Sequence, residues 1–226
     1  MKKLEVLFED NHLLVVNKPA GLATQGALPG KTSLVAAAQS YLKAKYAKPG
    51  NVFVGVVSRL DSQVSGVIVL ARTSKAAARL TSQFADSSVT KRYLALVPDV
   101  ANVPPKGELQ HHVWKDDRAQ RMRAETTPVR DSQVAKLRYK TIAEFAGSRL
   151  LEVTLLTGRK HQIRVQLAAI GIPIVGDRKY DSDQYFPVGV ALHSYFLGFE
   201  HPTKKETLTF RILPPDYWKL PTLPLD

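Results

Sequence analysis

The sequence predicts an α+β fold built on a large mixed, mostly antiparallel sheet with flanking helices. Segments typical of strands outnumber those typical of helices, and short hairpin-like connections outnumber helical crossovers. Hairpins join antiparallel strands, whereas parallel neighbours need longer crossovers. No linker rich in Ser, Gly or Pro interrupts the chain, so one domain over residues 1–226 is expected. Residues 102–107 are the best candidate for a boundary, but they are short enough for an ordinary loop.

The first half of the chain alternates between strand and helix patterns. The strands expected there are residues 4–10, 12–21, 52–58, 66–73 and 90–100. The apolar run within 66–73 is continuous, which indicates a buried strand. Two helices are expected, and each is preceded by a hydroxyl side chain that can cap its first turn. They are residues 33–47 with Thr32 or Ser33 as the cap, and residues 74–87 with Thr73 or Ser74 as the cap.

The second half of the chain is mainly β. Alternating stretches continue through residue 145 and are typical of antiparallel strands. They are interrupted at residues 104–107 and 114–118. The remaining strands are expected over residues 148–158, 191–202 and 206–213.

A third helix is expected at residues 161–172. Its apolar face carries Ile163, Leu167 and Ile170. Lys160 and Arg164 are expected to pair at i, i+4 on another face of this helix.

Charge and composition indicate a polyanionic partner. The 226 residues carry 32 Lys and Arg against 20 Asp and Glu, a formal net charge of +12. Such a surplus attracts polyanions, so nucleic acid or an anionic membrane is the leading expected partner. Nucleic acid is favoured over the alternative of a basic but indifferent enzyme surface. No apolar run approaches the ~20 residues of a membrane span, so a soluble protein is expected.

The chain contains no cysteine, which excludes disulfides, thiol catalysis and thiolate metal sites. Three acidic residues interrupt any signal-peptide pattern at the N-terminus: Glu5, Glu9 and Asp10. A cytoplasmic protein that is monomeric by default is expected.

Other chemistries fit the sequence poorly. The glycines Gly26 and Gly30 are separated by three residues, whereas a phosphate-binding P-loop needs four. The histidines show no metal-ligand spacing, so no metal is expected. Residues 176–183 contain three aspartates, but their spacing differs from a calcium loop, and a solvated loop is expected there.

The stretch "VSRLDSQVSG" at residues 57–66 carries the first candidate catalytic group. It is small and polar but joins two apolar segments, so its ends are anchored in the core. Gly66 permits a tight backbone approach just before the next strand. Asp61 has no acidic neighbour for a carboxylate pair, so it acts alone or with bases. The alternative is a surface loop with a local ion pair between Arg59 and Asp61, which contributes little.

The second stretch is "TGRKHQIRVQLAAIGIPIVGDRKY", residues 157–180. Its bases Arg159, Lys160 and Arg164 cluster at a strand–helix junction, where backbone amides favour anions. Arg164 lies among apolar residues, so its guanidinium is expected inside the protein with a partner. We nominate Asp61, because a buried Arg–Asp pair would hold the carboxylate ionised and nucleophilic at neutral pH. An ordinary basic helix end is the alternative.

Five blocks of the sequence resemble the RluA-type pseudouridine synthases. They are "VLFEDNHLLVVNKPAGLATQG", "SRLDSQVSGVIVLART", "KRYLALV", "GRKHQIRVQLAAIGIPIVGD" and "ALHSYFLGFEHP". The blocks appear in the family's order and span the chain from residue 6 to about residue 215. One block alone would be a weak match, whereas five in register make a specific one.

The resemblance implies an α+β domain whose mixed sheet is split by a central active-site cleft. It also implies an isomerase that converts uridine in RNA to pseudouridine with no cofactor and no metal. Asp61 matches the catalytic aspartate, and Arg164 matches the basic residue paired with it. Tyr93 matches the tyrosine that stacks on the uracil, and Arg59 matches the arginine that enters the helix in place of the flipped uridine. The other residues expected to bind substrate are Arg159, Lys160, His161 and Gln162.

The chain departs from the family pattern at a few positions. Ser58 stands in place of the usual histidine, and Val64 in place of the usual threonine. Gln166 and Lys160 stand where histidine and threonine are common. The replacements bear on loop packing and RNA contacts. We expect no appended S4-type RNA-binding domain, so the basic catalytic surface itself is expected to choose the RNA, ribosomal or transfer.

Two other functions remain alternatives at this point. The first is a non-catalytic RNA-binding module on the same fold. The second is an N-glycoside hydrolase in which Asp61 releases a free base. A hydrolase must admit an activated water, usually with a second carboxylate, and the sequence offers none near Asp61. Whether the carboxylate attacks the sugar, attacks the ring or removes a sugar proton stays open.

Overall fold

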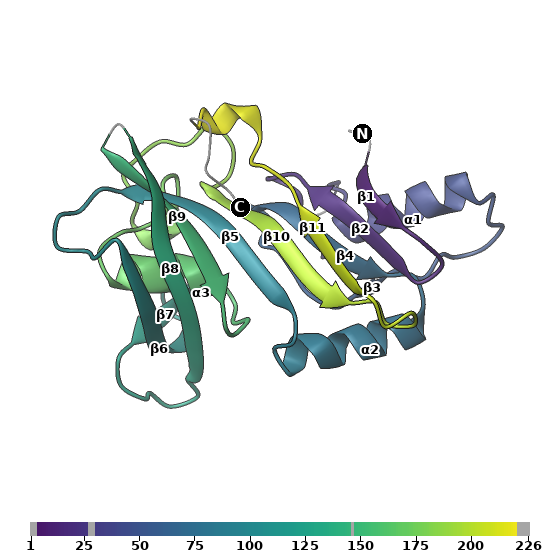
Figure 1. The fold of residues 1–226 in the computed structure, drawn as a ribbon, viewed down its shortest axis with the longest axis horizontal. Coiled ribbons are helices and arrows are strands. Elements are labelled where there is room, and N and C mark those ends of the chain that lie inside the picture. Colours follow the sequence, from purple (N-terminus) through teal and green to yellow (C-terminus); the bar gives the residue numbers. More distant parts are fainter. Residues whose placement is uncertain (1–3, 27–29, 146, 221–226) are drawn as a thin grey trace. The chain divides into compact units, whose positions relative to one another are not determined.

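The computed structural model describes residues 4–26, 30–145 and 147–220. It confirms the α+β class, with a mixed sheet and helices that connect its strands (Figure 1). The chain forms two compact units. Unit 1 runs through Thr90 and includes Ser194–Leu213, and unit 2 comprises Lys91–His193 with the chain from Pro214 onward. Residues 102–107, the boundary candidate, lie inside unit 2.

Unit 1 contains the N-terminal and C-terminal strands. They are β1 (Glu5–Glu9), β2 (Leu13–Lys18), β3 (Gly55–Val56), β4 (Ser65–Ala71), β10 (Leu192–Glu200) and β11 (Thr207–Arg211). The order is β1-β2-β4-β10, with β3 beside β4 and β11 beside β10. The pairs β1–β2, β2–β4, β3–β4 and β10–β11 are antiparallel. The strand expected at residues 52–58 is reduced to the two residues of β3.

The core of unit 1 confirms the prediction of a buried strand at β4. Every residue of β4 is buried, and so are Leu13–Val16 of β2. On one face of these strands, Val67 and Val69 pack in a cluster with Ala76 and Leu80 of helix α2 (Ser74–Ala85). A strand that is covered on both faces has no polar positions, which is why its sequence does not alternate.

The predicted helix caps are also confirmed in unit 1. Ser33 Oγ accepts a hydrogen bond from the Ala36 amide at the start of α1 (Leu34–Lys45). Thr73 Oγ1 accepts one from the Ala76 amide at the start of α2. None of the helices in the described part of the chain is long and apolar enough to cross a bilayer.

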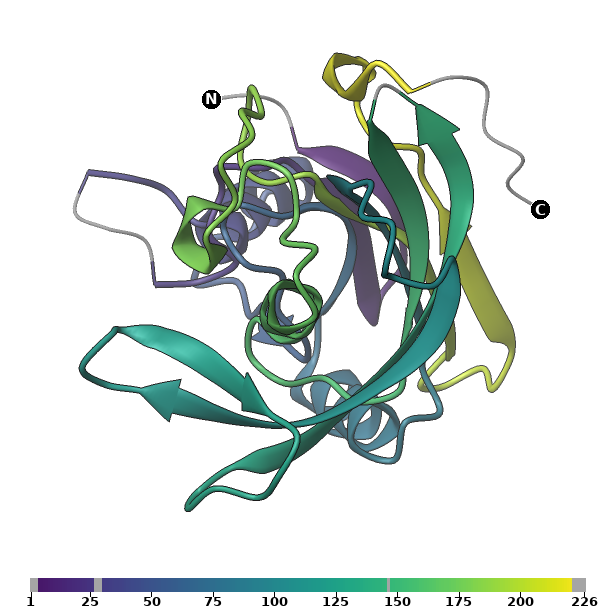
Figure 2. The same cartoon turned by 90° about the vertical axis from the view of Figure 1, so that its left-hand side faces the viewer.

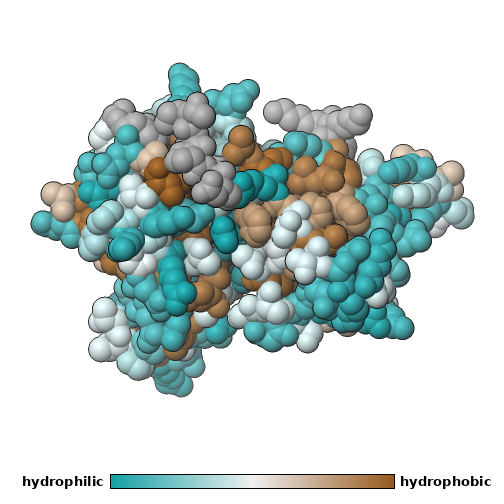
Figure 3. All heavy atoms as spheres, in the orientation of Figure 1, coloured by the Kyte–Doolittle hydropathy of each residue, from teal (hydrophilic) through white to brown (hydrophobic). Residues whose placement is uncertain are grey.

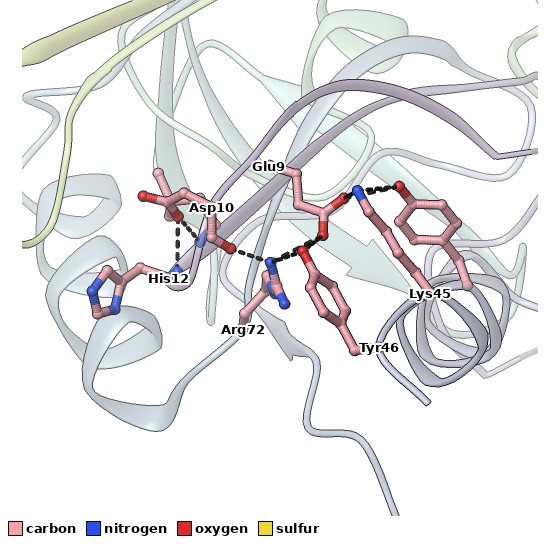
Figure 4. Close-up of polar contacts among 8 residues, drawn as sticks. Glu9, Asp10, His12, Lys45, Tyr46 and Arg72 are labelled. Carbon is pink, nitrogen blue, oxygen red and sulfur yellow. Dashed lines mark hydrogen bonds and ion pairs between the residues drawn. The ribbon is translucent and has the colours of Figure 1, made fainter. Parts of the chain in front are cut away.

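Glu9, at the end of β1, ties this strand to the C-terminal turn of α1 (Figure 4). Its carboxylate accepts hydrogen bonds from Tyr46 at 2.5 Å and Tyr41 at 2.8 Å. It also forms ion pairs with Lys45 at 2.8 Å and Arg72 at 3.0 Å. Burial opposes ionisation, but the hydrogen bonds from Lys45, Tyr46 and Tyr41 outweigh it and lower the pKa of Glu9.

Unit 2 is an antiparallel array with one helix against it. Its strands are β5 (Thr90–Pro98), β6 (Lys106–Asp116), β7 (Arg121–Glu125), β8 (Gln133–Phe145) and β9 (Ser148–Leu155), in the order β5-β9-β8-β6-β7. The helix α3 (Gln162–Ala169) places Val165 in a cluster with Val113 of β6 and Ala135 of β8. Figure 2 shows α3 end-on against these curved strands, with the β6–β7 hairpin extending beyond it.

Gly66 is the position in unit 1 where a side chain is least tolerable. Its φ is +119°, in the region that favours glycine. A Cβ there would lie 2.6 Å from the Ser194 nitrogen and closer still to the Ser194 carbonyl oxygen. The start of β4 and the start of β10 therefore approach each other so closely that only glycine fits, as the sequence predicted for this position.

Gly66→Ala should destabilise the protein by at least ~3 kcal/mol, because backbone strain and a backbone clash act together. Gly171→Ala is the matched control, since Gly171 also has a positive φ, +81°, but no atom within 4 Å of the added Cβ. The control should cost about 1 kcal/mol. Urea denaturation of both variants measures the difference, and equal losses would contradict the steric argument.

Candidate active site

The loop that carries Asp61 is braced from inside unit 1. The Thr24 hydroxyl donates to the Leu60 carbonyl at 2.8 Å, and the Gly21 amide donates to the Ser62 carbonyl at 2.7 Å. The Val64 amide donates to the Asp61 carbonyl at 3.0 Å, which closes a turn around the aspartate. Residues 18–24 and 60–64 thus hold each other, and Asp61 is placed on fixed backbone although it lies in a loop.

Lys18 lies at the centre of this brace. It is the last residue of β2 and is completely buried. Its Nζ donates to the carbonyl oxygens of Pro19 at 3.0 Å and Leu22 at 2.8 Å. Burial lowers the pKa of Lys18 to about 7, and the negative charge of Asp61 opposes this shift. The ammonium and the Asp61 carboxylate are therefore close enough to interact.

Arg59 and Asp61 have different environments in the same loop. The Arg59 side chain is exposed, and no ion pair or hydrogen bond joins it to the part of the chain that the structure describes. The Asp61 side chain is partly buried. The alternative of a local ion pair between these two residues is therefore wrong. The exposed guanidinium remains available to a partner outside the chain.

Unit 2 contains a second group of buried polar side chains, which includes Tyr93 and Lys91. Tyr93 is buried on β5, where it pairs in register with Val153 of β9. Lys91, two residues earlier on the same strand, is also buried, and burial lowers its pKa. A Cβ on Gly158 would lie 3.6 Å from the Lys91 Nζ, so Lys91 reaches the turn that precedes α3.

Arg164 is buried, as predicted, but the aspartate that the structure pairs with it was not anticipated. Its Nε donates to Asp177 at 2.7 Å, and its Nη2 donates to the other oxygen of the same carboxylate at 2.8 Å. Asp177 is 1% exposed. The interpretation of residues 176–183 as a solvated loop is therefore wrong at Asp177, and Tyr180 and Ser182 in the same segment are buried as well.

His161 belongs to the same cluster as Arg164. Its Nδ1 lies 2.7 Å from the Tyr180 hydroxyl, and the Arg164 guanidinium lies over the Tyr180 ring at 5.0 Å from its centroid. The His161 backbone is left-handed, with a φ of 55°, immediately before α3. The structure thus brings together two of the predicted residues, Arg164 and His161, through Tyr180.

Gln162 serves the protein's own backbone. Its carbonyl oxygen accepts from the Thr157 hydroxyl at 2.8 Å and the Arg159 amide at 2.9 Å. Its amide nitrogen donates to the Lys136 carbonyl at 2.9 Å. These contacts use both the carbonyl oxygen and the amide nitrogen of the buried Gln162 side chain. Gln162 therefore shapes the turn before α3, and its amide is not turned toward solvent.

The remaining bases of this turn are exposed. The Arg159 Nε donates to the Val134 carbonyl at 3.1 Å, and Lys160 lies outside α3, which begins at Gln162. The predicted i, i+4 pairing of Lys160 with Arg164 is therefore wrong. The helix starts two residues too late for it, and Arg164 is buried with Asp177.

Sequence reasoning missed three of the residues that organise these clusters: Lys18, Asp177 and Tyr180. Each had a signal. Lys18 comes two residues after the apolar run Leu13–Val16, on the strand that carries this run. Asp177 and Tyr180 follow the apolar run at residues 172–175, as Asp61 follows another apolar segment. A charged residue that follows an apolar run is the pattern that Lys18, Asp61 and Asp177 share.

Comparison with known proteins identifies the family of the chain. The family model described as RNA pseudouridylate synthase matches residues 12–169. The chain is 34% identical over 218 residues to the ribosomal large subunit pseudouridine synthase D of Zymomonas mobilis, covering 92% of this chain and 68% of that protein. It is 33% identical to the RNA pseudouridine synthase YlyB of Bacillus subtilis, covering 96% of this chain and 71% of the relative.

Solved structures show the same fold. Human RNA pseudouridylate synthase domain containing 4 superposes with a TM-score of 0.78 at 25% identity, covering 95% of this chain and 90% of that one. Human RNA pseudouridylate synthase domain containing 1 has a TM-score of 0.75, also at 25% identity, covering 94% and 84%. The family match includes the positions of Asp61, Tyr93 and Arg164. The chain therefore belongs to the RNA pseudouridylate synthase family.

Proposed function

We propose that Asp61, Tyr93 and Arg164 isomerise uridine to pseudouridine in structured RNA, with ribosomal RNA as the first substrate class and transfer RNA as the second. Two relatives from Zymomonas mobilis and Xylella fastidiosa carry names that refer to the large ribosomal subunit, which supports the first class. The net charge of +12 favours a polyanion. The proposal needs no cofactor, and it takes the enzyme to be a cytoplasmic monomer.

The reaction conserves every atom of the uridine. The bond from ring N1 to sugar C1′ breaks, the ring turns, a bond from ring C5 to C1′ forms, and the proton on C5 leaves while N1 gains one. We assign the ionised carboxylate to Asp61 and its guanidinium partner to Arg164. Tyr93 stacks on the uracil and takes part in removing the C5 proton. Arg59 enters the RNA helix where the base has left the stack, a step that costs a few kcal/mol.

The observation that carries the proposal is the hydrogen-bonded brace that holds the Asp61 loop against residues 18–24, with the buried Lys18 amine at its centre. The loop of Asp61 is braced by hydrogen bonds, so the carboxylate is held in place without being fully covered. A carboxylate that is preorganised beside a cation suits a reaction that develops charge in a restricted site. The exposed side chains of Arg59, Arg159 and Lys160 support a role in contacting RNA, whereas the internal contacts of Gln162 favour a role in shaping the turn.

Asp61→Asn should abolish pseudouridine formation, with a rate loss of ~10³-fold or more, because the amide can act neither as nucleophile nor as base. Pseudouridines are mapped across all RNAs of cells that lack the gene and carry the wild-type or the variant chain. A site that returns only with the wild type identifies the substrate. Asp86→Asn is the control, since Asp86 is an exposed aspartate of the same unit.

The two other functions give different outcomes in the same cells and in vitro. A non-catalytic RNA-binding module leaves every pseudouridine unchanged when the gene is removed. An N-glycoside hydrolase releases free uracil and leaves an abasic site, whereas isomerisation leaves the mass of the RNA unchanged. Pseudouridines that stay unchanged when the gene is removed would refute the proposed activity. Release of free uracil with an abasic site would refute it as well.

Lys18 should make stability depend on pH. Its pKa is about 7 in the folded protein against 10.5 for an unperturbed lysine, so between these values the unfolded chain binds one more proton than the folded one. Stability from this group therefore rises with pH across that window, by at most ~1.4 kcal/mol per pH unit, and the full cost of the buried charge is present below about pH 7.

Lys18→Met removes this titration. The free energy of unfolding of the wild type minus that of the variant should rise from pH 7 to pH 10 in urea denaturation experiments. In an Asp61→Asn background the rise should begin at lower pH, because the Asp61 charge that favours the ammonium is gone. A difference that stays constant with pH would refute the pKa assigned to Lys18.

We also propose that the exposed face of β8 holds the RNA backbone. Lys136, Arg138 and Lys140 alternate along this strand with the buried residues Ala135, Leu137 and Tyr139. Arg138 and Lys140 form ion pairs at 2.8 and 3.0 Å with Glu108 and Glu152, but their side chains remain 65% and 61% exposed. Hydrophilic residues are spread over the face of the molecule that Figure 3 shows.

Replacing Lys136, Arg138 and Lys140 with alanine should weaken RNA binding and flatten its dependence on salt. Each lost phosphate contact lowers the slope of log K against log salt by about 0.7 to 0.9. The control replaces three exposed lysines of unit 1 with alanine, Lys43, Lys48 and Lys75, for the same change in net charge. Filter binding from 50 to 300 mM salt measures both variants. Equal slopes would show that only the overall charge matters.

A further inference from the structure

The ion pair between Arg164 and Asp177 is unusual because both partners are almost fully buried, with side chains 5% and 1% exposed. Taking two charges out of water costs several kcal/mol per ion, and a buried pair often contributes little net stability. A well-packed pair of apolar residues would serve the core equally well. The pair therefore calls for an explanation other than stability, and the direction of the guanidinium provides one.

Asp177 holds Arg164 by a defined edge. The carboxylate accepts from Nε and Nη2, so both oxygens are used and the planar guanidinium cannot rotate without losing a hydrogen bond. Pairing along this edge directs the Nη1 side of the guanidinium away from Asp177. Only arginine has this fork of donors, because the ammonium of a lysine lacks a fixed plane.

The backbone that presents Asp177 is itself fixed. The Asp177 amide donates to the Ile174 carbonyl at 2.9 Å. Its carbonyl accepts from the amides of Tyr180 at 2.9 Å and Ser182 at 3.2 Å, within the short 3-10 turn Arg178–Tyr180. The carboxylate thus extends from a closed turn, which limits how far the Arg164 side chain can shift.

Tyr180 completes the restraint from the flat side of the guanidinium. Its ring covers Arg164 at 5.0 Å, which is a cation–π distance. The ring cannot slide, because its hydroxyl accepts from the Met122 amide at 3.3 Å and lies 2.7 Å from the His161 Nδ1. Arg164 is therefore held in its plane by Asp177 and along the normal to that plane by Tyr180.

We propose that Asp177 is a positioning residue that sets the direction in which Arg164 presents its guanidinium. This inference rests on the proposed function, since it takes Arg164 as a residue of the active site. Asp177 does not contact the reacting atoms. It acts by preventing small rotations of Arg164, and misplacement of a catalytic group by about 1 Å can cost ~10²-fold in rate.

The test uses Asp177→Asn in the full-length chain. Asparagine has the same shape but only one acceptor, so one of the two hydrogen bonds to Arg164 is lost. Rates are measured in single turnover with enzyme in saturating excess over the RNA substrate, which reports only on folded molecules. The rate should fall ~10- to 100-fold while the Kd for RNA stays within about threefold. A wild-type rate would overturn the proposal.

A second background separates positioning from a general structural role. Asp177→Asn is combined with Arg164→Lys, in which no planar fork remains to be oriented. The asparagine substitution should then cause less than a threefold further loss of rate. If it lowers the rate by the same factor in both backgrounds, Asp177 does not act through Arg164 and the proposal is refuted.

A third variant covers the case in which Asp177→Asn does not fold. Asp177→Glu keeps the charge but moves the carboxylate by one methylene, so the ion pair survives in an altered direction. Its rate should also fall by at least about tenfold with RNA affinity unchanged. A wild-type rate in the glutamate variant would count against the proposal.

The control for loss of a buried carboxylate is Glu9→Gln in unit 1. Glu9 is 6% exposed and paired with Arg72, so it matches Asp177 in burial and charge (Figure 4). It should lose stability but keep a wild-type single-turnover rate. The failure of this inference is distinguishable from failure of the proposed function. If the wild-type chain forms no pseudouridine, the proposed function is wrong, and if it does and Asp177→Asn matches it, only the positioning role is wrong.

Discussion

A charge that is removed from water must be held by partners that do not move, and this constraint explains the buried polar cluster in each unit. In unit 1 the buried ammonium of Lys18 is held by two backbone carbonyls and interacts with Asp61. In unit 2 the buried guanidinium of Arg164 is held by Asp177 and covered by Tyr180. Hydrogen bonds hold the turns around each cation, so the oxygen atoms that accept from Lys18 and Arg164 keep their positions.

The two buried cations are stabilised in different ways, and the difference follows from their chemistry. A lysine can lose its proton, so the cost of burying Lys18 appears as a lowered pKa and its partners can be neutral carbonyls. An arginine stays charged at any ordinary pH, so Arg164 requires a carboxylate and receives both oxygens of one. Lys18 is thus a site of adjustable charge, whereas Arg164 is a site of permanent charge and fixed direction.

Most of the fold could be predicted from local patterns. The continuous apolar run of β4 and the hydroxyl caps Ser33 and Thr73 determine their elements through short-range physics. The strand at residues 52–58 was overestimated, because an apolar run alone does not show where a pairing partner ends. The helix expected at residues 161–172 was placed too long at its end, because α3 stops at Ala169 and the Ile172 amide bonds back to the Leu167 carbonyl in the turn that follows.

Within the candidate site, the burial of Arg164 could be predicted, because apolar residues flank it in the sequence. Its contact with Asp177 could not be predicted, because that contact is tertiary. Asp177 stands among other acidic and basic residues, and composition alone favours a solvated loop there. Only the fold shows that Asp177 turns inward while Asp181 and Asp183 remain exposed. Spacing in sequence identifies which residues carry chemistry, but it does not identify which charges they neutralise.

The left-handed backbone of His161 limits how this position can drift over evolutionary time. A φ of 55° is tolerated by glycine, and among other residues mainly by asparagine, aspartate and histidine, while β-branched residues are excluded. Of the tolerated residues, glycine has no side chain with which to meet the Tyr180 hydroxyl. A histidine recurring here among related chains would therefore reflect the left-handed backbone together with the contact to the Tyr180 hydroxyl, and its presence alone would be no sign of acid–base chemistry.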